Sequence, residues 1–347
     1  MDQSGKRPSL GSLKSIKRGL FLFIILSVIA FLYLLLKNNA TENIKAWNQL
    51  NVFYLLLGLV FVAIDLFIGG WRNHIFLKEF MPGVKLMVSV KANVANMFMG
   101  AVTPTQSGGG PAAWFVFYRN GVSIINMVGT SFYTWITTLI FLPISGGIAL
   151  LILKDSIPNE FIHNLAKFGL GVFFTVVMLI LIALKAPKFI EGVFSVLLFF
   201  LKNIFHRKGD KLISLKEKTV KKILVYRENY LEFIVKRKWL LPLCLFFTFI
   251  LFGIKGTLAY VFTIGLGLDV NYWHIIAMMA ISNLLLYFAP TPGGSGIAEI
   301  SLTALLSQLM PAEYALIVTV LHRSFLTFIP AIIGAVVLVT EAGKDDV

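Results

Sequence analysis

Two short segments of this chain each begin with Thr-Pro, continue into a glycine-rich turn and interrupt an apolar stretch. They read Thr103-Pro104-Thr105-Gln106-Ser107-Gly108 and Thr291-Pro292-Gly293-Gly294-Ser295-Gly296, and each follows an asparagine, Asn96 or Asn283, by a turn or two. A helix cannot continue through either segment, because proline lacks an amide donor and glycine adopts backbone angles that other residues avoid. A helix that resumes beyond such a break presents unpaired amides and the positive end of its dipole, which favour an anion. The sequence therefore predicts two helix breaks with anion-binding chemistry, with close helix packing through small residues as the alternative.

Four charged side chains lie deep within apolar stretches, namely Asp65, Lys255, Glu299 and Arg323. An ionised group at the bilayer centre costs about 2.5–3.5 kcal/mol on insertion scales, so such groups face a cavity or one another. Because two acids and two bases balance, mutual pairing and substrate binding are both open. Arg323 is the predicted phosphate contact, since a planar guanidinium with five donors suits phosphate better than an ammonium group does.

The other three charges have less specific predicted roles. Glu299 falls in the first turn of the resumed helix, where a carboxylate is favoured by the dipole and can cap free amides. Lys255 is either a second substrate contact or a side chain that snorkels to the membrane surface. Asp65 either balances a cationic group of the substrate or holds Lys255.

Apolar helices must position these residues. Of 347 residues, 57% are hydrophobic and 14% charged, against roughly 45–50% and about 25% in a soluble domain. Six apolar runs are long enough to cross a bilayer; they span Gly19–Leu36, Val52–Gly70, Ile124–Leu153, Ala166–Leu184, Trp239–Leu266 and Ala315–Thr340. Two further stretches, 92–118 and 274–310, contain the breaks. The sequence thus predicts an all-α integral membrane protein with six transmembrane helices and two broken, re-entrant helix pairs.

The distribution of basic residues orients this arrangement. With the amino terminus in the cytoplasm, 25 of the 31 lysines and arginines fall on the cytoplasmic side, four fall outside, and Lys255 and Arg323 remain in the bilayer. Membrane proteins carry such an excess on their cytoplasmic side. We therefore expect a multi-pass protein of the cytoplasmic (inner) membrane with both termini in the cytoplasm. The first broken stretch then enters from the cytoplasm and the second from outside, which predicts an inverted repeat.

The predicted organisation has four parts. A basic cytoplasmic tail (1–18) precedes a first membrane half (19–184), and a linker (185–238) leads to a second half (239–347). The linker combines apolar residues at near-helical spacing with many lysines, which predicts a basic amphipathic helix on the anionic inner leaflet. A plain basic linker is the alternative. The single cysteine, Cys244, excludes an internal disulfide and a cysteine metal site, and no metal, cofactor or nucleic-acid partner is predicted.

The segment Thr291–Glu299, followed by an arginine at 323 within a membrane span, resembles the lysylphosphatidylglycerol synthase transmembrane, or flippase-like, family. The resemblance extends over most of the chain, including 96–110 and Asp65. It implies a membrane region that carries lipids such as lysylphosphatidylglycerol across the bilayer, with the family's acid and arginine carried over onto Glu299 and Arg323 and its early aspartate onto Asp65. In that family a separate soluble domain transfers lysine from charged tRNA; this chain ends at Val347 without one, so aminoacyl transfer is not expected here.

The sequence and the resemblance together predict a lipid translocase for a phosphate-bearing lipid, with or without an aminoacyl or sugar substituent. The substrate contacts would come from the four charged side chains, the two asparagines and the polar or glycine residues of both breaks: Arg323, Glu299, Asp65, Lys255, Asn96, Asn283, Thr103, Thr105, Gln106, Gly108, Thr291, Gly293, Gly294, Ser295 and Gly296. A secondary transporter of a small polar or anionic solute would use the same features. An integral enzyme that modifies lipid head groups and a scaffold are weaker alternatives, and no catalytic residue is predicted. The expected partners are a membrane phospholipid or other anionic lipid and the anionic inner leaflet; a homodimer is compatible with the sequence.

Overall fold

The structure, a computed structural model, describes residues 13–37, 45–154, 237–287 and 289–343, with short pieces between 160 and 178. The first twelve residues of the tail, most of the span predicted at Ala166–Leu184 and nearly all of the linker lie outside this part. The chain divides into two compact units, Met1–Gly169 with Leu243–Val347, and Leu170–Pro242. The described residues of the second unit are short helical pieces and the first turn of α10. Apart from that first turn of α10, everything that follows lies in the first unit.

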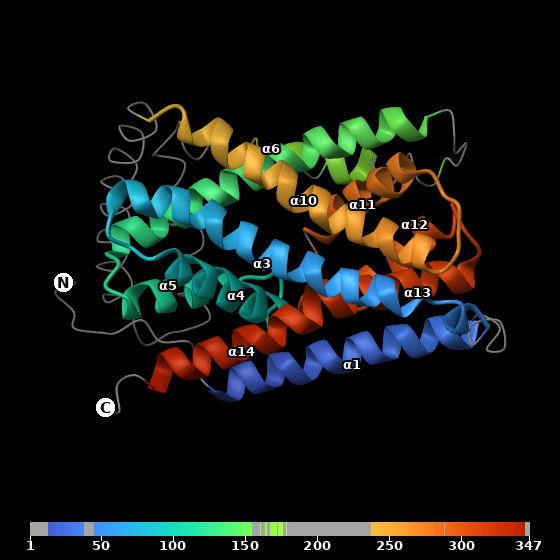
Figure 1. Cartoon of the computed structure of the whole chain (residues 1–347), viewed down its shortest axis with the longest axis horizontal. Helices are drawn as coiled ribbons and strands as arrows, with labels where there is room; N and C mark the ends of the chain where they lie inside the picture. The colour runs from blue at the N-terminus through green and yellow to red at the C-terminus, as the bar shows by residue number, and fades with distance from the viewer. Residues whose placement is uncertain are drawn as a thin grey trace, which may run out of the picture. The chain divides into compact units, whose positions relative to one another are not determined.

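The main elements of the described part are ten α-helices and one short π-helix (Figure 1), beside a helical turn at 45–48 and the short pieces between 160 and 178. They are α1 (Leu13–Lys37), α3 (Val52–Phe80), α4 (Leu86–Val102), α5 (Gly109–Arg119), α6 (Ile124–Leu153), α10 (Leu240–Gly265), α11 (Tyr272–Leu286), α12 (Ile297–Leu306), α13 (Ala312–Arg323), η1 (Ser324–Phe328) and α14 (Ile329–Ala342). No strand occurs among these residues, and four stretches are long and apolar enough to cross a membrane: Val52–Phe80, Asn126–Leu153, Leu240–Gly265 and Ala312–Ala342. The expected all-helical, multi-pass membrane protein is confirmed at this level.

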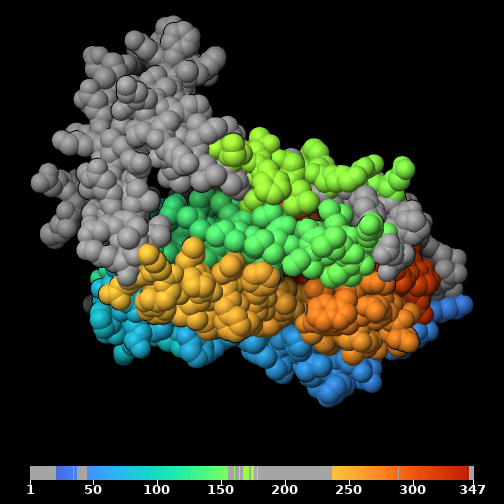
Figure 2. Space-filling model, turned by 90° about the horizontal axis from the view of Figure 1, so that it is seen from above, coloured from blue at the N-terminus to red at the C-terminus, as the bar shows by residue number. Residues whose placement is uncertain are grey.

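The surface of the long helices is apolar where lipid would be the solvent. On α3, Leu56 and Val60 are 60% and 52% exposed, and on α10 Phe246 is 59% exposed. Between α6 and α10, in contrast, apolar rings pack together: Phe141 stacks on Phe252 with ring centroids 4.4 Å apart. Figure 2 shows the yellow-orange residues of α10 lying directly against the green residues of α6. A helix at the edge of a membrane bundle requires exposed hydrophobic side chains on its lipid face and packed side chains on its inner face.

The order of elements repeats within the unit. A long helix, a broken helix pair and a further long segment follow one another as α3, α4–α5, α6 and again as α10, α11–α12, α13–α14. The first helix of each pair packs against the last segment of the other half: α4 lies against α14, and α11 lies against α6. This exchange draws both breaks toward the interior of one unit.

Helix α3 is longer than the apolar run that predicted it. The run ends at Gly70, whereas the helix continues to Phe80. The physical reason is that no helix breaker follows until Pro82, so the polar residues after Gly70 remain helical. This extension carries Arg72, which the sequence reading assigned to a cytoplasmic segment, into the body of the protein.

Candidate substrate cavity and the two helix breaks

The two breaks predicted from sequence are present, and they touch each other. Helix α4 ends at Val102 and α5 begins at Gly109, while α11 ends at Leu286 and α12 begins at Ile297. The backbones of Pro104 and Pro292 form an isolated antiparallel bridge. Sequence reading predicted each break but gave no signal that the two would meet.

Both breaks use the same tight turn. The Ser107 amide donates to the Pro104 carbonyl at 3.1 Å, and the Ser295 amide donates to the Pro292 carbonyl at 2.9 Å. The two central residues of each turn have positive φ, 51° and 56° at Thr105 and Gln106, and 56° and 71° at Gly293 and Gly294. Two consecutive positive φ angles closed by this bond are the pattern of a type I′ turn. The repeated motif therefore encodes a repeated backbone shape.

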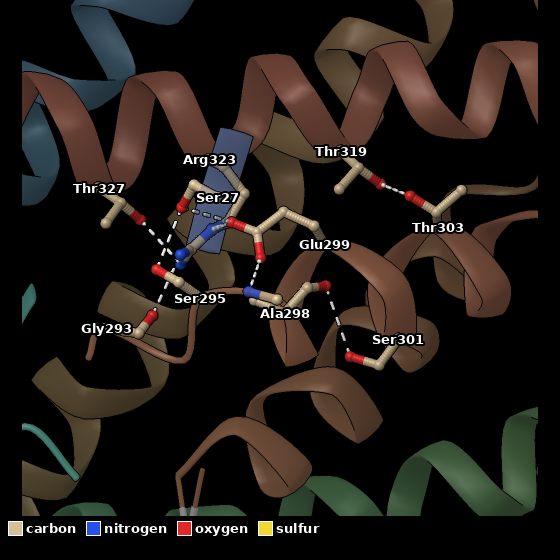
Figure 3. A network of polar contacts seen from close by, with 11 residues as sticks. Ser27, Gly293, Ser295, Ala298, Glu299, Ser301, Thr303, Thr319, Arg323 and Thr327 are labelled. Carbon is tan, nitrogen blue, oxygen red and sulfur yellow. Dashed lines mark hydrogen bonds and ion pairs between the residues drawn. The ribbon is translucent and has the colours of Figure 1, made fainter. Parts of the chain in front are cut away.

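The second break is held by a buried carboxylate. Glu299 is fully buried, and its Oε2 accepts the Gly296 amide at 2.6 Å, which is the cap predicted from its place in the first turn of α12. Its Oε1 accepts from the Arg323 Nε at 3.2 Å. The Ser27 hydroxyl of α1 lies 3.2 Å from the same oxygen and 3.1 Å from the Ser295 hydroxyl (Figure 3). Three separate helices thus converge on one break.

Arg323 uses every nitrogen of its guanidinium inside the protein. Besides the bond to Glu299, its Nη1 donates to the Thr327 hydroxyl and its Nη2 to the Gly293 carbonyl, both at 3.1 Å (Figure 3). The π-helical turn η1 begins directly after Arg323 and contains Thr327. Such single π turns are frequent at functional sites, and here one places a hydroxyl against the arginine.

A cavity of about 880 Å³ lies within the unit, bounded by residues of both broken pairs and of the long helices α3, α6 and α10. Eight of the predicted contacts line it: Asp65, Asn96, Thr105, Gln106, Lys255, Asn283, Gly293 and Arg323. Seven others are not among its lining residues: Glu299, Thr103, Gly108, Thr291, Gly294, Ser295 and Gly296. The structure therefore brings most of the predicted charged and amide side chains together around one cavity. Most residues of the second turn do not line it.

Two threonines that do not line the cavity, Thr103 and Thr291, lie at the starts of the two breaks. The Thr103 hydroxyl accepts the Gly108 amide at 2.8 Å and donates to the Met99 carbonyl at 2.6 Å, so it caps the first break from within. The buried Thr291 hydroxyl has no hydrogen-bond partner among the described residues. A substrate role for these positions remains a prediction.

The second predicted charge pair also faces the cavity. The Lys255 ammonium lies 3.5 Å from the Asp65 carboxylate, which is 1% exposed, while the lysine side chain is 24% exposed. The Lys255 carbonyl is 3.1 Å from the Nε2 of His322, another lining residue. Of the two roles left open for Asp65, the geometry displays the one in which it holds Lys255.

Sequence reading missed Arg72. This residue lines the cavity, and its Nη1 donates to the hydroxyls of Thr138 on α6 at 3.4 Å and Thr248 on α10 at 3.2 Å. The signal that could have found it is the uninterrupted run between Gly70 and Pro82, which extends the helix past the apolar segment. The cavity is thus lined by three cationic side chains and by one carboxylate, that of Asp65. In the part of the chain that the structure describes, no group of three His, Cys, Asp or Glu residues is placed to hold a metal ion.

Two comparisons with known proteins agree with this picture. Residues 20–334 match the family model described as "Lysylphosphatidylglycerol synthase TM region". The chain is also 23% identical over 339 residues to "UPF0104 membrane protein PH1989" from Pyrococcus horikoshii, an alignment that covers 92% of this chain and 96% of the relative. The family match spans both breaks, all three cations of the cavity, and the buried acids Asp65 and Glu299.

Proposed function

The chain belongs to the family of the lysylphosphatidylglycerol synthase TM region, and on that premise we propose that it is a lipid translocase that moves a phosphate-bearing lipid across the cytoplasmic membrane. The observation that carries the proposal is the cavity of about 880 Å³ with a cationic wall inside a bundle of apolar helices. This volume falls in the range of about 300–1,000 Å³ typical of small-molecule sites. The head group would occupy the cavity while the acyl chains stay in lipid.

The repeated element order supports a specific architecture for this function. We take the two broken pairs as re-entrant and oppositely inserted, so that with six membrane spans the halves form an inverted repeat with both termini in the cytoplasm. Discontinuous helices at matching positions of two halves are the usual substrate site of such transporters, and one half rocks against the other around it. The bridge between Pro104 and Pro292 lies where the two halves would separate. The basic linker would rest on the anionic inner leaflet.

A matched pair of glycines allows the cavity to be blocked without touching any charge. Gly100 lines the cavity, and a Cβ there would meet nothing nearer than the Gln106 Cβ at 3.6 Å. Gly147 on α6 does not line the cavity, and a Cβ there would have nothing within 4 Å. Gly100→Leu therefore fills the cavity, whereas Gly147→Leu adds the same side chain elsewhere.

The test is leaflet exchange of a phosphatidylglycerol with a fluorescent acyl chain in vesicles that contain the purified protein. Label in the inner leaflet becomes accessible to an impermeant quencher only if it crosses the bilayer. We expect crossing with the wild type and with Gly147→Leu, and a loss of at least about tenfold with Gly100→Leu, the effect of about 1.4 kcal/mol on a barrier. Crossing no faster than in protein-free vesicles contradicts the proposal. If the vesicles instead take up a small organic anion in a manner that Gly100→Leu blocks, a solute transporter is the better assignment.

A further inference from the structure

The three cations of the cavity wall are not equivalent. Lys255 forms an ion pair with Asp65 at 3.5 Å, and Arg323 forms one with Glu299 at 3.2 Å. Arg72 forms no ion pair with any carboxylate of the described residues, and both of its hydrogen bonds go to hydroxyl groups. The two pairs carry no net charge, so among the described residues Arg72 is the cation of this wall that no carboxylate contacts as an ion pair.

The hydroxyls that hold Arg72 do not neutralise it. The Thr138 hydroxyl donates its own proton to the Thr134 carbonyl at 2.9 Å, and the Thr248 hydroxyl donates to the Cys244 carbonyl at 2.8 Å. Their lone pairs are therefore turned toward the guanidinium and fix its position. Neutral acceptors orient a cation without cancelling its charge.

One donor of Arg72 is also left over. Its Nε is buried and has no hydrogen-bond partner among the residues that the structure describes. A buried, charged donor without an acceptor costs more than an ordinary hydrogen bond contributes, so such groups are normally satisfied. On α6, Ser131 lines the same cavity, and its hydroxyl accepts the Trp114 Nε1 proton at 2.8 Å, which leaves its own proton to meet a remaining oxygen of an anion.

We propose that Arg72 is the anion-binding residue of the cavity and that it selects a head group with one negative charge, a phosphodiester. A monoanion cancels the single unpaired cation, whereas a phosphomonoester carries up to two charges into a wall that offers only one. Guanidinium and phosphate oxygens form two parallel charge-assisted bonds, which suits this geometry. That the phosphodiester belongs to a lipid rests on the proposed function. The proposal makes Arg323, whose three nitrogens are already engaged, a positioning residue of the second break.

The binding test uses native mass spectrometry of the full chain after exchange into micelles with phosphatidylglycerol, phosphatidic acid or diacylglycerol. We expect the wild type to retain phosphatidylglycerol over both others, and Arg72→Gln to lose that retention by about tenfold or more, which is the lower end for a charge-assisted bond. The matched control is Lys78→Gln, which removes an exposed charge from the same helix outside the cavity; its retention stays at the wild-type level. Unchanged retention by Arg72→Gln overturns the proposal, and stronger retention of phosphatidic acid overturns the selection of one charge.

Thermal unfolding of the delipidated protein shows whether a variant that loses lipid retention is still folded. Because Arg72→Gln removes an uncompensated charge, its Tm equals or exceeds that of the wild type, while Arg323→Gln breaks a buried pair and lowers the Tm. A fall in Tm for Arg72→Gln as large as that for Arg323→Gln makes Arg72 structural and overturns the proposal.

The outcomes separate this inference from the proposed function. Retention that depends on Arg72 without leaflet exchange in wild-type vesicles refutes the translocase and supports the site. Leaflet exchange at the wild-type rate in Arg72→Gln refutes the site and supports the translocase. Displacement of the lipid by soluble glycerophosphoglycerol supports a phosphodiester site at Arg72 and identifies a soluble source for its ligand.

Discussion

The two helix breaks share one backbone design and differ in nearly everything around it. Residues Pro104–Ser107 and Pro292–Ser295 form the same turn, with positive φ at both central positions. In the first break these four residues are exposed, and Thr105 and Gln106 adopt an angle that is usually left to glycine. In the second break Pro292, Gly294 and Ser295 are buried, and glycine occupies both strained positions.

The difference lies in what each turn is attached to. The second break is bound to Glu299, Arg323 and α1, and Gly293 approaches the other break so closely that a Cβ there would lie 2.8 Å from the Ala101 carbonyl oxygen. At the position that matches Glu299, the first break has Pro111, whose side chain can neither accept a hydrogen bond nor carry charge. One break is thus a fixed anchor, while the other presents side chains to the cavity. Strained positions that keep side chains are typical of functional sites.

The largest effect is expected from breaking the anchor. Arg323→Gln leaves the buried Glu299 carboxylate unpaired, which should lower the free energy of unfolding by about 3–5 kcal/mol. Thr105→Ala in the first break should change it by less than about 0.5 kcal/mol, as is usual for an exposed site. Denaturant titration in mixed micelles measures both.

A double variant tests whether Arg323 and Glu299 act as one buried pair. Arg323→Met combined with Glu299→Leu removes both charges, so it should be less destabilised than the sum of the two single changes. An Arg323→Gln protein within about 1 kcal/mol of the wild type would show that the pair is not an anchor.

An intermediate effect is expected from a methyl group at Gly293. Gly293→Ala meets the Ala101 backbone and must keep a φ of 56°, so steric overlap and strain together should cost about 2–4 kcal/mol. Gly296→Ala has a φ of 83° but nothing within 4 Å, so strain alone should cost about 1–2 kcal/mol. Thermal unfolding ranks the two variants, and equal losses would mean that the contact between the breaks contributes nothing.

The smallest effect has the opposite sign. Gln106→Gly relieves a positive φ at an exposed position, and after the entropy cost of glycine the protein should gain about 0.5–1 kcal/mol. Because Gln106 lines the cavity, we expect the same variant to exchange lipid more slowly, a gain in stability with a loss of function. Faster exchange, or a loss of stability, would remove the distinction between the two breaks.

Much of this arrangement could be predicted because it depends on local chemistry. Proline and glycine determine where the helices break, and a carboxylate in the first turn of α12 caps the break wherever the rest of the chain lies. Lys255 and Asp65 could be paired from the rule that charges in an apolar bundle seek partners. The all-helical architecture follows from composition alone.

What escaped prediction depends on tertiary packing. Nothing in the local sequence says that Pro104 meets Pro292, or that Ser27, in a helix read only as a membrane span, reaches Glu299. Arg323 was the expected phosphate contact because its chemistry suits phosphate, but its three internal bonds became visible only with the fold. Arg72 counts among the cytoplasmic residues by sequence because the apolar run ends at Gly70, whereas the helix continues to Phe80.

The most direct measurement is an experimental structure of the protein in lipid nanodiscs that contain phosphatidylglycerol. We expect phosphate density inside the cavity within hydrogen-bond distance of the Arg72 guanidinium, with the bonds from Arg323 to Glu299 and Gly293 intact. A phosphate bound to Arg323 with its pair to Glu299 broken, or lipid held only on the outer surface of the helices, would contradict it.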